Sequence, residues 1–224
     1  MEWNAFRPLR PSGSMTLRLS ITGLAACATL LTPVLHAGQD GPSPIKVFIL
    51  AGQSNMQGHG EISPVTSTNT LEHLVAHDRT GEFDFLGSRT SWTERGDVWI
   101  HYERSPGNLL TGDLTAGYGA SNSTIGPELG FGHVVGEYFD NQVLLVKTAW
   151  GGKSLAVDFR PPRSSGDTGF YYNEVLRLYR DATTRLATHF PSYDGQGFEL
   201  VGFGWHQGWN DRVNQSFNDE YEEN

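Results

Sequence analysis

Short apolar runs predict the strands of a buried sheet. The first run covers residues 46–50 (KVFIL) and is stopped by Ala51 and Gly52. Similar runs lie at residues 98–102, 142–146 and 198–205. Four strands, separated by long stretches of chain, are therefore expected.

Helical patterns lie between these runs. Pro127 follows Gly126 and, with Glu128 in the first turn, predicts the start of a helix. A stronger pattern predicts a helix over residues 172–190, because apolar side chains recur there at helical spacing. The apolar face of the first helix is expected to contain Leu129, Val134, Val135, Tyr138 and Phe139. That of the second is expected to contain Val175, Leu178, Tyr179, Ala182, Leu186, Ala187 and Phe190.

The remaining segments predict surface loops. Residues 57–95 are rich in Gly, Ser, Thr and Asp, with one short helix expected at residues 71–77, and residues 105–127 are punctuated by Gly and Pro. Residues 218–224 are expected to form the first turns of a further helix. Alternating strands and helices favour right-handed crossovers. We expect an α/β fold, a three-layer α/β/α sandwich with a mainly parallel central sheet.

Residues 1–37 are expected to be a signal peptide rather than part of the fold. Three arginines, Arg7, Arg10 and Arg18, precede a mostly apolar segment at residues 19–35, and cleavage is expected after Ala37. Met15 is an alternative start, because MTLRLS forms a compact basic opening. A lipoprotein signal at Cys27 is less favoured, because no polar tether follows it. The apolar segment is too short to predict a stable membrane span.

Residues 38–224 are expected to form one domain that is secreted or periplasmic. The chain has 224 residues, with 16 basic and 25 acidic side chains and a net charge of -9, which disfavours nucleic acid or an anionic membrane as a partner. The six Trp, eight Tyr and twelve Phe suit sugar stacking as well as core packing. With a single cysteine and no His/Asp/Glu cluster at ligand spacing, no disulfide, metal or other cofactor is expected.

Ser54 is the candidate nucleophile. It follows the first predicted strand in the segment GQSNM, and the carboxyl ends of parallel strands are where α/β proteins place their sites. A serine at the start of a helix can aim its own backbone N–H at a developing oxyanion. Gly52 would allow the tight turn before it. Taken alone, such a serine is more often a helix cap.

Four segments resemble the sialate O-acetylesterase-like carbohydrate esterases, within the SGNH hydrolases. They are ILAGQSNMQG at residues 49–58, IGPELGFG at 125–132, KTAWGGKSL at 147–155 and GWHQGWND at 204–211. The segments occur in the order of the family, and the resemblance covers nearly all of residues 45–224. It implies a flavodoxin-like sheet and hydrolysis of O-acetyl esters.

The resemblance assigns roles to several residues. Ser54 is implied as the nucleophile, and Gly126, with Gly130 as the weaker alternative, as a backbone donor to the oxyanion. A side-chain amide completes the oxyanion hole. Both Gln207 and Asn210 are candidates, since GWND fits the superfamily pattern while the carbohydrate-esterase branch more often has Gln-Gly-Glu-Ser. Each well-placed donor is worth about 3–4 kcal/mol in the transition state.

The substrate is expected to lie against residues that follow two strands. Gln53 and Asn55 flank Ser54, and Trp150, Gly151 and Lys153 follow the strand at residues 142–146. Trp150 with its two glycines is interpreted as a sugar-stacking floor, with strand-end packing as an equal alternative. Trp205 and Trp209 carry the same two interpretations, and Trp205 is expected to be core.

A general base for Ser54 is missing from these segments. The superfamily supplies it from an Asp-x-x-His segment, and none lies downstream of Asn210. His59 and His206 are weak candidates. We expect the sheet to be truncated, with the histidine beyond Asn224.

The expected function is therefore a serine esterase that removes acetyl groups from polysaccharides or sialic acids through an acyl-Ser54 intermediate. The alternative is a non-catalytic carbohydrate-binding protein or inactive fragment on the same fold. A lipase or thioesterase would need a long apolar groove, which no segment predicts. A metal enzyme is the least favoured class.

Overall fold

The computed structural model describes residues 43–88 and 91–224. The predicted signal peptide, the alternative start at Met15 and Cys27 lie outside the described residues, so these interpretations stay predictions. Within the described part of the chain, no helix is long and apolar enough to cross a membrane.

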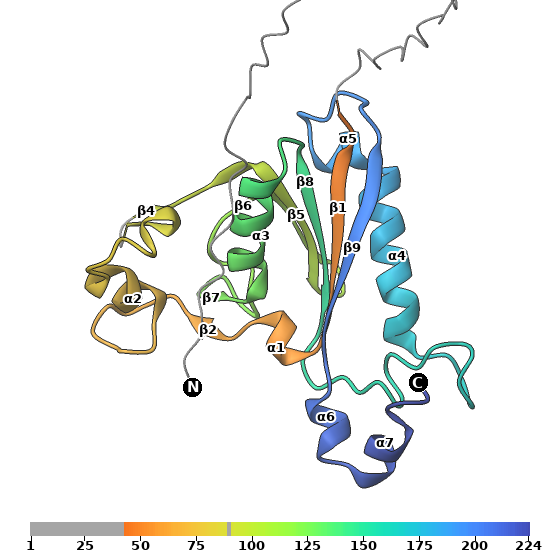
Figure 1. Cartoon of the computed structure of the whole chain (residues 1–224). Coiled ribbons are helices and arrows are strands. Elements are labelled where there is room, and N and C mark those ends of the chain that lie inside the picture. The colour runs from red at the N-terminus through yellow and green to blue at the C-terminus, as the bar shows by residue number, and fades with distance from the viewer. Residues whose placement is uncertain (1–42, 89–90) are drawn as a thin grey trace, which may run out of the picture. The chain divides into compact units, whose positions relative to one another are not determined.

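A five-stranded sheet forms the centre of the structure (Figure 1). Its strands, in the spatial order β6-β5-β8-β1-β9, are Asn108–Leu114, Arg95–Ser105, Val143–Ala149, Ile45–Gly52 and Phe198–His206. β1 pairs in parallel with both β8 and β9, and β8 pairs in parallel with β5. Only β6 runs antiparallel to its neighbour. The predicted α/β fold with a mainly parallel sheet is confirmed.

β6 corrects the prediction that residues 105–127 are loop. It pairs with β5 across a turn at Gly107, whose φ of +79° suits glycine. β6 lies at the edge of the sheet, and six of its seven residues are exposed or only partly buried. An edge strand of this kind lacks the continuous apolar run that revealed the buried strands.

Short elements occupy the region before β5. α2, Leu71–His77, has the predicted bounds, and the Thr70 side chain caps it by accepting from the His73 N–H at 3.2 Å. The η1 turn spans Asp84–Leu86. Two-residue ladders join β2, Gly60–Glu61, to β7, Thr124–Ile125, and β3, Gly87–Ser88, to β4, Ser91–Trp92.

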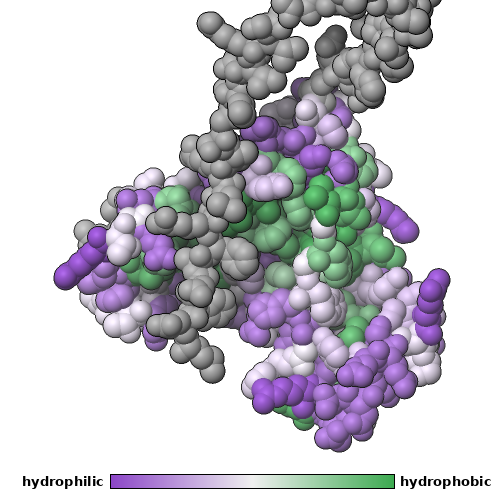
Figure 2. Space-filling view, viewed as in Figure 1, coloured by the Kyte–Doolittle hydropathy of each residue, from purple (hydrophilic) through white to green (hydrophobic). Residues whose placement is uncertain are grey.

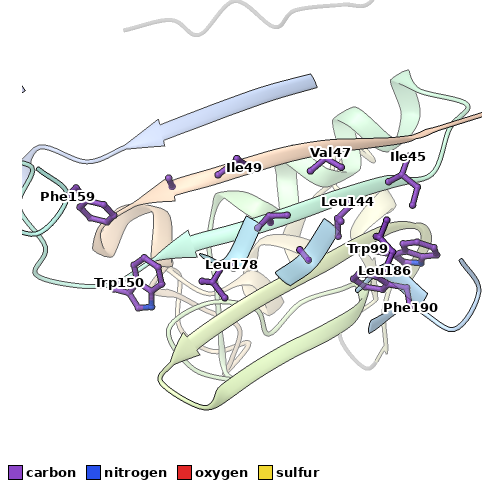
Figure 3. Close-up of a cluster of buried hydrophobic side chains, with 13 residues drawn as sticks. Ile45, Val47, Ile49, Trp99, Leu144, Trp150, Phe159, Leu178, Leu186 and Phe190 are labelled. Atoms are coloured by element: carbon purple, nitrogen blue, oxygen red, sulfur yellow. The ribbon is translucent and has the colours of Figure 1, made fainter. Parts of the chain in front are cut away.

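Helices cover both faces of the sheet, which confirms the three layers (Figure 1). α3, Pro127–Tyr138, packs on one face against a buried cluster of Leu50, Val98, Ile100, Val143 and Leu145. α4, Phe170–Thr184, and α5, Leu186–His189, pack on the other. Figure 3 shows the second core, where Leu178, Leu186 and Phe190 meet strand residues such as Val47 and Leu144.

The buried face of α3 differs from the predicted one. Leu129 and Val135 are buried as expected, but Val134 and Tyr138 are 69% and 79% exposed. Gly132 lies on the buried face instead, where a Cβ would come within 2.1 Å of the Leu114 side chain. The helix therefore approaches the sheet through small residues, which an apolar pattern does not mark.

The helix predicted over residues 172–190 starts at Phe170 and is broken at Arg185, which separates α4 from α5. Ala187, expected on the apolar face, is exposed. Phe190, just after α5, stacks on Trp99 of β5 at 4.6 Å between ring centroids. This contact fixes the end of the helical segment against the sheet.

The last helices are α6, Trp209–Arg212, and α7, Gln215–Glu220. The expected helix start at residue 218 is wrong, because Asn214 caps α7 through its side chain and residues 221–223 form turns. Along β9, many apolar side chains are exposed, and Figure 2 shows hydrophobic surface over this part of the sheet. They are Phe198, Leu200, Val201, Phe203 and Trp205.

Candidate active site

Three chain segments converge at the carboxyl ends of β1, β8 and β9. Gly52 at the end of β1 is paired with Ala149 of β8 and with His206 of β9. Ser54 follows as the first residue of α1, Ser54–Gln57, and is half-buried. The parallel register thus brings three distant parts of the sequence to the carboxyl end of the sheet, as expected for an α/β sheet.

The turn that presents Ser54 depends on Gly52. Its φ is +156°, and a Cβ there would lie 2.3 Å from the His206 carbonyl oxygen. Two backbone hydrogen bonds hold the turn: the Gln53 N–H donates to the His206 oxygen at 3.2 Å, and the Trp150 N–H donates to the Gly52 oxygen at 3.2 Å. Both neighbouring strands therefore fix the position of Ser54.

The Gln53 side chain, 1% exposed, links Ser54 to the segment after β9. Its amide nitrogen lies 3.5 Å from Ser54 Oγ and 3.4 Å from Asn210 Oδ1. Its carbonyl oxygen accepts from Gln207 Nε2 at 3.2 Å and from the Asn210 N–H at 3.3 Å. Gln53, predicted to bind substrate, is occupied in positioning the site.

The side-chain nitrogen of Gln207 is hydrogen-bonded within the protein. Its Nε2 donates to Gln53, to the Lys153 carbonyl oxygen at 3.1 Å and to a carboxylate oxygen of Asp211. Asp211 is fully buried and also accepts from the N–H groups of Leu155 and Ala156 at 2.9 Å. This role of Asp211 was not predicted, and its only signal in the sequence was its place in the GWND segment.

Asn210 presents a side-chain amide to the site. Its Oδ1 is used by Gln53, whereas its Nδ2 has no hydrogen-bond partner among residues 43–88 and 91–224. A Cβ on Gly152 would lie 3.9 Å from that nitrogen. Of the two predicted amide donors, Asn210 is the one whose N–H groups are available.

Gly151 lies beside Ser54. A Cβ at this position would be 4.0 Å from the Ser54 Cβ and 3.0 Å from Gln57 Oε1. The loop after β8 therefore passes next to the nucleophile, at a residue predicted only to contact substrate, and its N–H makes no hydrogen bond in the described chain.

Gly126, predicted as a backbone donor to the oxyanion, has its N–H engaged elsewhere in this structure, and its role stays a prediction. Its N–H donates to Glu128 Oε1 at 2.8 Å, and its backbone packs against Gly58. The weaker alternative, Gly130, lies on the exposed side of α3, where a Cβ would meet open space. The segment at residues 125–132 supports the turn after α1 instead of lining the site.

A buried ion pair fixes that support. Lys147 and Glu128 are both fully buried, with Nζ and Oε2 2.6 Å apart, and Lys147 also donates to the carbonyl oxygens of Gln57 and Tyr118 at 2.8 and 2.7 Å. Burial raises the pKa of Glu128 and lowers the pKa of Lys147, while their contact opposes both shifts. A lysine inside an apolar strand was the sequence signal for this pair.

The aromatic side chains near the site differ from prediction. Trp150 is 7% exposed, packs against Tyr171 and donates through Nε1 to the Glu103 carbonyl oxygen at 3.1 Å, so it is core packing and not a sugar floor. Trp205, expected to be core, is exposed and stacks with Phe203. Trp209 is also exposed.

The other predicted contacts are mixed. Asn55 is exposed next to Ser54. The Lys153 ammonium is engaged by Asp158 at 3.6 Å and by the Tyr171 ring at 4.5 Å. Roles for both in substrate binding stay predictions.

Ser54 Oγ has no base within reach in the described part of the chain. Its one hydrogen bond is from Gln53 Nε2, and both His59 and His206 are exposed side chains without a bond to Ser54. No group of three potential metal ligands lies among the described residues of this site, although one lies elsewhere in the fold.

Comparison with known families gives a match over residues 44–224. The matching profile is described as "Carbohydrate esterase, sialic acid-specific acetylesterase". No curated protein sequence matches the chain.

Solved structures are similar at low sequence identity. A protein from Arabidopsis thaliana is 16% identical, with a TM-score of 0.51 over 80% of this chain and 64% of its own. NanS is 16% identical (TM-score 0.44, 82% and 62% covered), and a carbohydrate acetylesterase from Xanthomonas citri is 14% identical (TM-score 0.32, 74% and 32% covered). The chain thus spans about two thirds or less of the length of these proteins, and the Arabidopsis protein shares its fold.

Proposed function

Since the chain belongs to the carbohydrate esterase family of sialic acid-specific acetylesterases, we propose that it removes O-acetyl groups from carbohydrates through an acyl-Ser54 intermediate. Acetylated polysaccharides and sialic acids are the candidate substrates. One observation carries the proposal: Ser54, Gly151 and Asn210, from the segments that follow β1, β8 and β9, meet at the carboxyl end of the sheet.

The first step is acylation. Ser54 Oγ attacks the carbonyl carbon of the acetyl ester, and the carbonyl oxygen becomes an oxyanion. The backbone N–H groups of Ser54 and Gly151 and the Asn210 side-chain amide are the proposed donors to it, at about 3–4 kcal/mol each. The sugar hydroxyl leaves with a proton, and acetyl-Ser54 remains.

The second step is deacylation. A water molecule attacks acetyl-Ser54 through a second oxyanion held by the same donors, and acetate is released. Both steps need a base that takes a proton, first from Ser54 and then from water. The residues described in the structure place no base at Ser54 Oγ. We therefore propose that acylation and turnover by the 224-residue chain are both slow.

The contacts of the Gln53 side-chain amide support the proposed role of Ser54 as the nucleophile. A nearly fully buried glutamine that contacts Ser54 Oγ, Asn210 and Gln207 restricts the nucleophile and the donor loop together. Orienting reacting groups before the substrate arrives is a large part of enzymatic rate enhancement. A serine that only capped a helix would not need such a link to a second loop.

The decisive experiment follows acylation and not turnover. The chain is incubated with p-nitrophenyl acetate, and the acetyl group is located by mass spectrometry of peptides. We expect acetylation at Ser54, release of p-nitrophenol, and loss of both in Ser54→Ala. Acetylation spread over surface lysines, unchanged in Ser54→Ala, would refute the proposed nucleophile.

The absence of a base at Ser54 among the described residues also favours a second candidate, a carbohydrate-binding protein without catalysis. Equilibrium binding to acetylated and deacetylated forms of the same polysaccharide separates the two. Binding to both forms, with no acylation of Ser54, would favour the binding protein. Export of the protein, predicted from residues 1–37, is proposed to give access to such substrates.

A further inference from the structure

Three potential metal ligands meet on the α4–α5 side of the sheet. His101 belongs to β5, Asp181 to α4 and His189 to α5. One ligand atom of each lies within 4.8 Å of the other two. No cluster at ligand spacing was expected from the sequence, and the fold makes this one by joining His101 to Asp181, 80 positions away.

The geometry is centred on one carboxylate oxygen. Asp181 Oδ2 is 3.0 Å from His101 Nε2 and 2.9 Å from His189 Nε2. Ligand atoms of a tetrahedral zinc ion are about 3.3 Å apart, given metal–ligand bonds of about 2.0–2.1 Å. The two distances to Asp181 are therefore close to the spacing in a coordination shell, and the two histidine nitrogens lie within 4.8 Å of each other.

The His189 ring provides a second, independent observation. Its side chain is 7% exposed, and its Nε2 is buried without a hydrogen-bond partner in the described part of the chain. The short distance to Asp181 therefore lacks the alignment of a hydrogen bond. If His189 Nε2 and Asp181 Oδ2 both bound one metal ion, they would lie close together without a hydrogen bond between them. Shared coordination therefore explains both the short distance and the missing alignment.

The surroundings of the cluster fix its carboxylate. Arg185 Nη1 holds the other carboxylate oxygen, Oδ1 of Asp181, at 2.9 Å. Such outer partners orient metal ligands. Trp99 lies two residues before His101, and Phe190 directly follows His189. The stacking of Trp99 on Phe190 therefore holds the two histidine-bearing segments against each other.

We propose that His101, Asp181 and His189 bind one divalent transition-metal ion of the zinc type, with two imidazole nitrogens and one carboxylate oxygen as ligands and solvent completing the shell. This site is separate from Ser54 and its donors. The ion links β5 to the C-terminal end of the α4–α5 segment. Mixed nitrogen and oxygen donors favour zinc and its neighbours over calcium or magnesium.

The test is zinc binding by the metal-free 224-residue chain, measured in competition with a chromophoric chelator. We expect saturation at one Zn²⁺ per chain and a rise in Tm with Zn²⁺, because an ion that binds only the folded state stabilises it. His189→Gln and Asp181→Asn should weaken binding by at least about 100-fold, beyond the loss of about 10–100-fold typical of outer-shell changes. Circular dichroism of the metal-free variants checks that they fold.

The matched control is the pair on α2 of His73, which is partly buried, and His77, which is exposed; their rings stack at 3.9 Å and could collect metal at the surface. The double variant His73→Ala/His77→Ala should bind Zn²⁺ as the parent does. Cobalt gives a second readout, since Co²⁺ in the buried site should show a visible absorption band that His189→Gln abolishes. The proposal is overturned by the absence of one-to-one binding, by unchanged binding in both ligand variants, or by its loss in the α2 control.

Discussion

The side-chain amide nitrogen of Gln207 donates to the side-chain oxygen of Gln53 at 3.2 Å, although 154 positions separate the two residues. This bond joins the loop that carries Ser54 to the loop after β9. It also uses the group that would make Gln207 an oxyanion donor. Asn210, whose Nδ2 is available, is therefore distinguished from Gln207 by geometry, where the sequence left both open.

Asn210→Ala tests the donor. We expect the rate of Ser54 acylation by p-nitrophenyl acetate to fall about 100- to 1000-fold, the usual loss for one oxyanion donor. Stability should change little, since the Asn210 side chain is only partly buried. The slow release of p-nitrophenol, followed by absorbance over a long incubation, and urea unfolding give the two values. An acylation rate within a factor of about two of the parent would exclude Asn210 as a donor.

Gln207→Leu should lower the stability of the protein more than the rate of acylation. It leaves the buried carboxylate of Asp211 without its side-chain donor, at a cost of about 1–3 kcal/mol in the free energy of unfolding. The acylation rate should fall less than in Asn210→Ala. Urea denaturation measures the first effect. If Gln207→Leu kept full stability and lost acylation more severely, the assignment of the two amides would have to be reversed.

Gly151→Ala tests the backbone at the nucleophile. The added methyl group would lie 3.0 Å from Gln57 Oε1 and 4.0 Å from the Ser54 Cβ, in the space proposed for the acetyl group. We expect slower acylation with a small change in stability. Gly130→Ala is the control: its Cβ meets open space on a helix, so it should leave acylation unchanged and stabilise by about 0.5–1 kcal/mol. Slower acylation in Gly130→Ala would instead return the donor to the α3 segment.

Lys147→Met should destabilise the protein by about 3–5 kcal/mol, because it leaves the Glu128 carboxylate buried without its charge partner. The double variant Lys147→Met/Glu128→Leu removes both charges and should recover most of that loss. Urea unfolding of the parent, both single variants and the double variant gives the coupling energy directly. Equal stability of the Lys147→Met and double variants would contradict the proposed penalty for an unpaired charge.

The strands could be predicted wherever burial on both faces produced a continuous apolar run, as at residues 46–50. β6 was missed because an edge strand needs no such run, and Gly112 within it resembled loop. The face of α3 was mispredicted for a related reason: Gly132 and Gly136 are buried because a close helix needs small residues, not because they are apolar.

The site was predictable where chemistry is local. Ser54, which follows a strand and a glycine, lies at the carboxyl end of the sheet, as the sequence predicted. The choice of Gly151 over Gly126 depends on which strands flank β1, and no local pattern contains that. The cluster of His101, Asp181 and His189 depends on tertiary contacts in the same way.

In the described sheet, β9 has a neighbour only on its β1 side, and its outward side chains include Phe203, 59% exposed. Unpaired backbone groups beside an apolar surface form a template on which another extended chain can add. The chain in isolation should therefore be sensitive to its own concentration, with strand-to-strand addition at β9 as the first step of aggregation. Strand β9, more apolar at its surface than the other edge strand β6, is then the first segment to protect when the protein is concentrated.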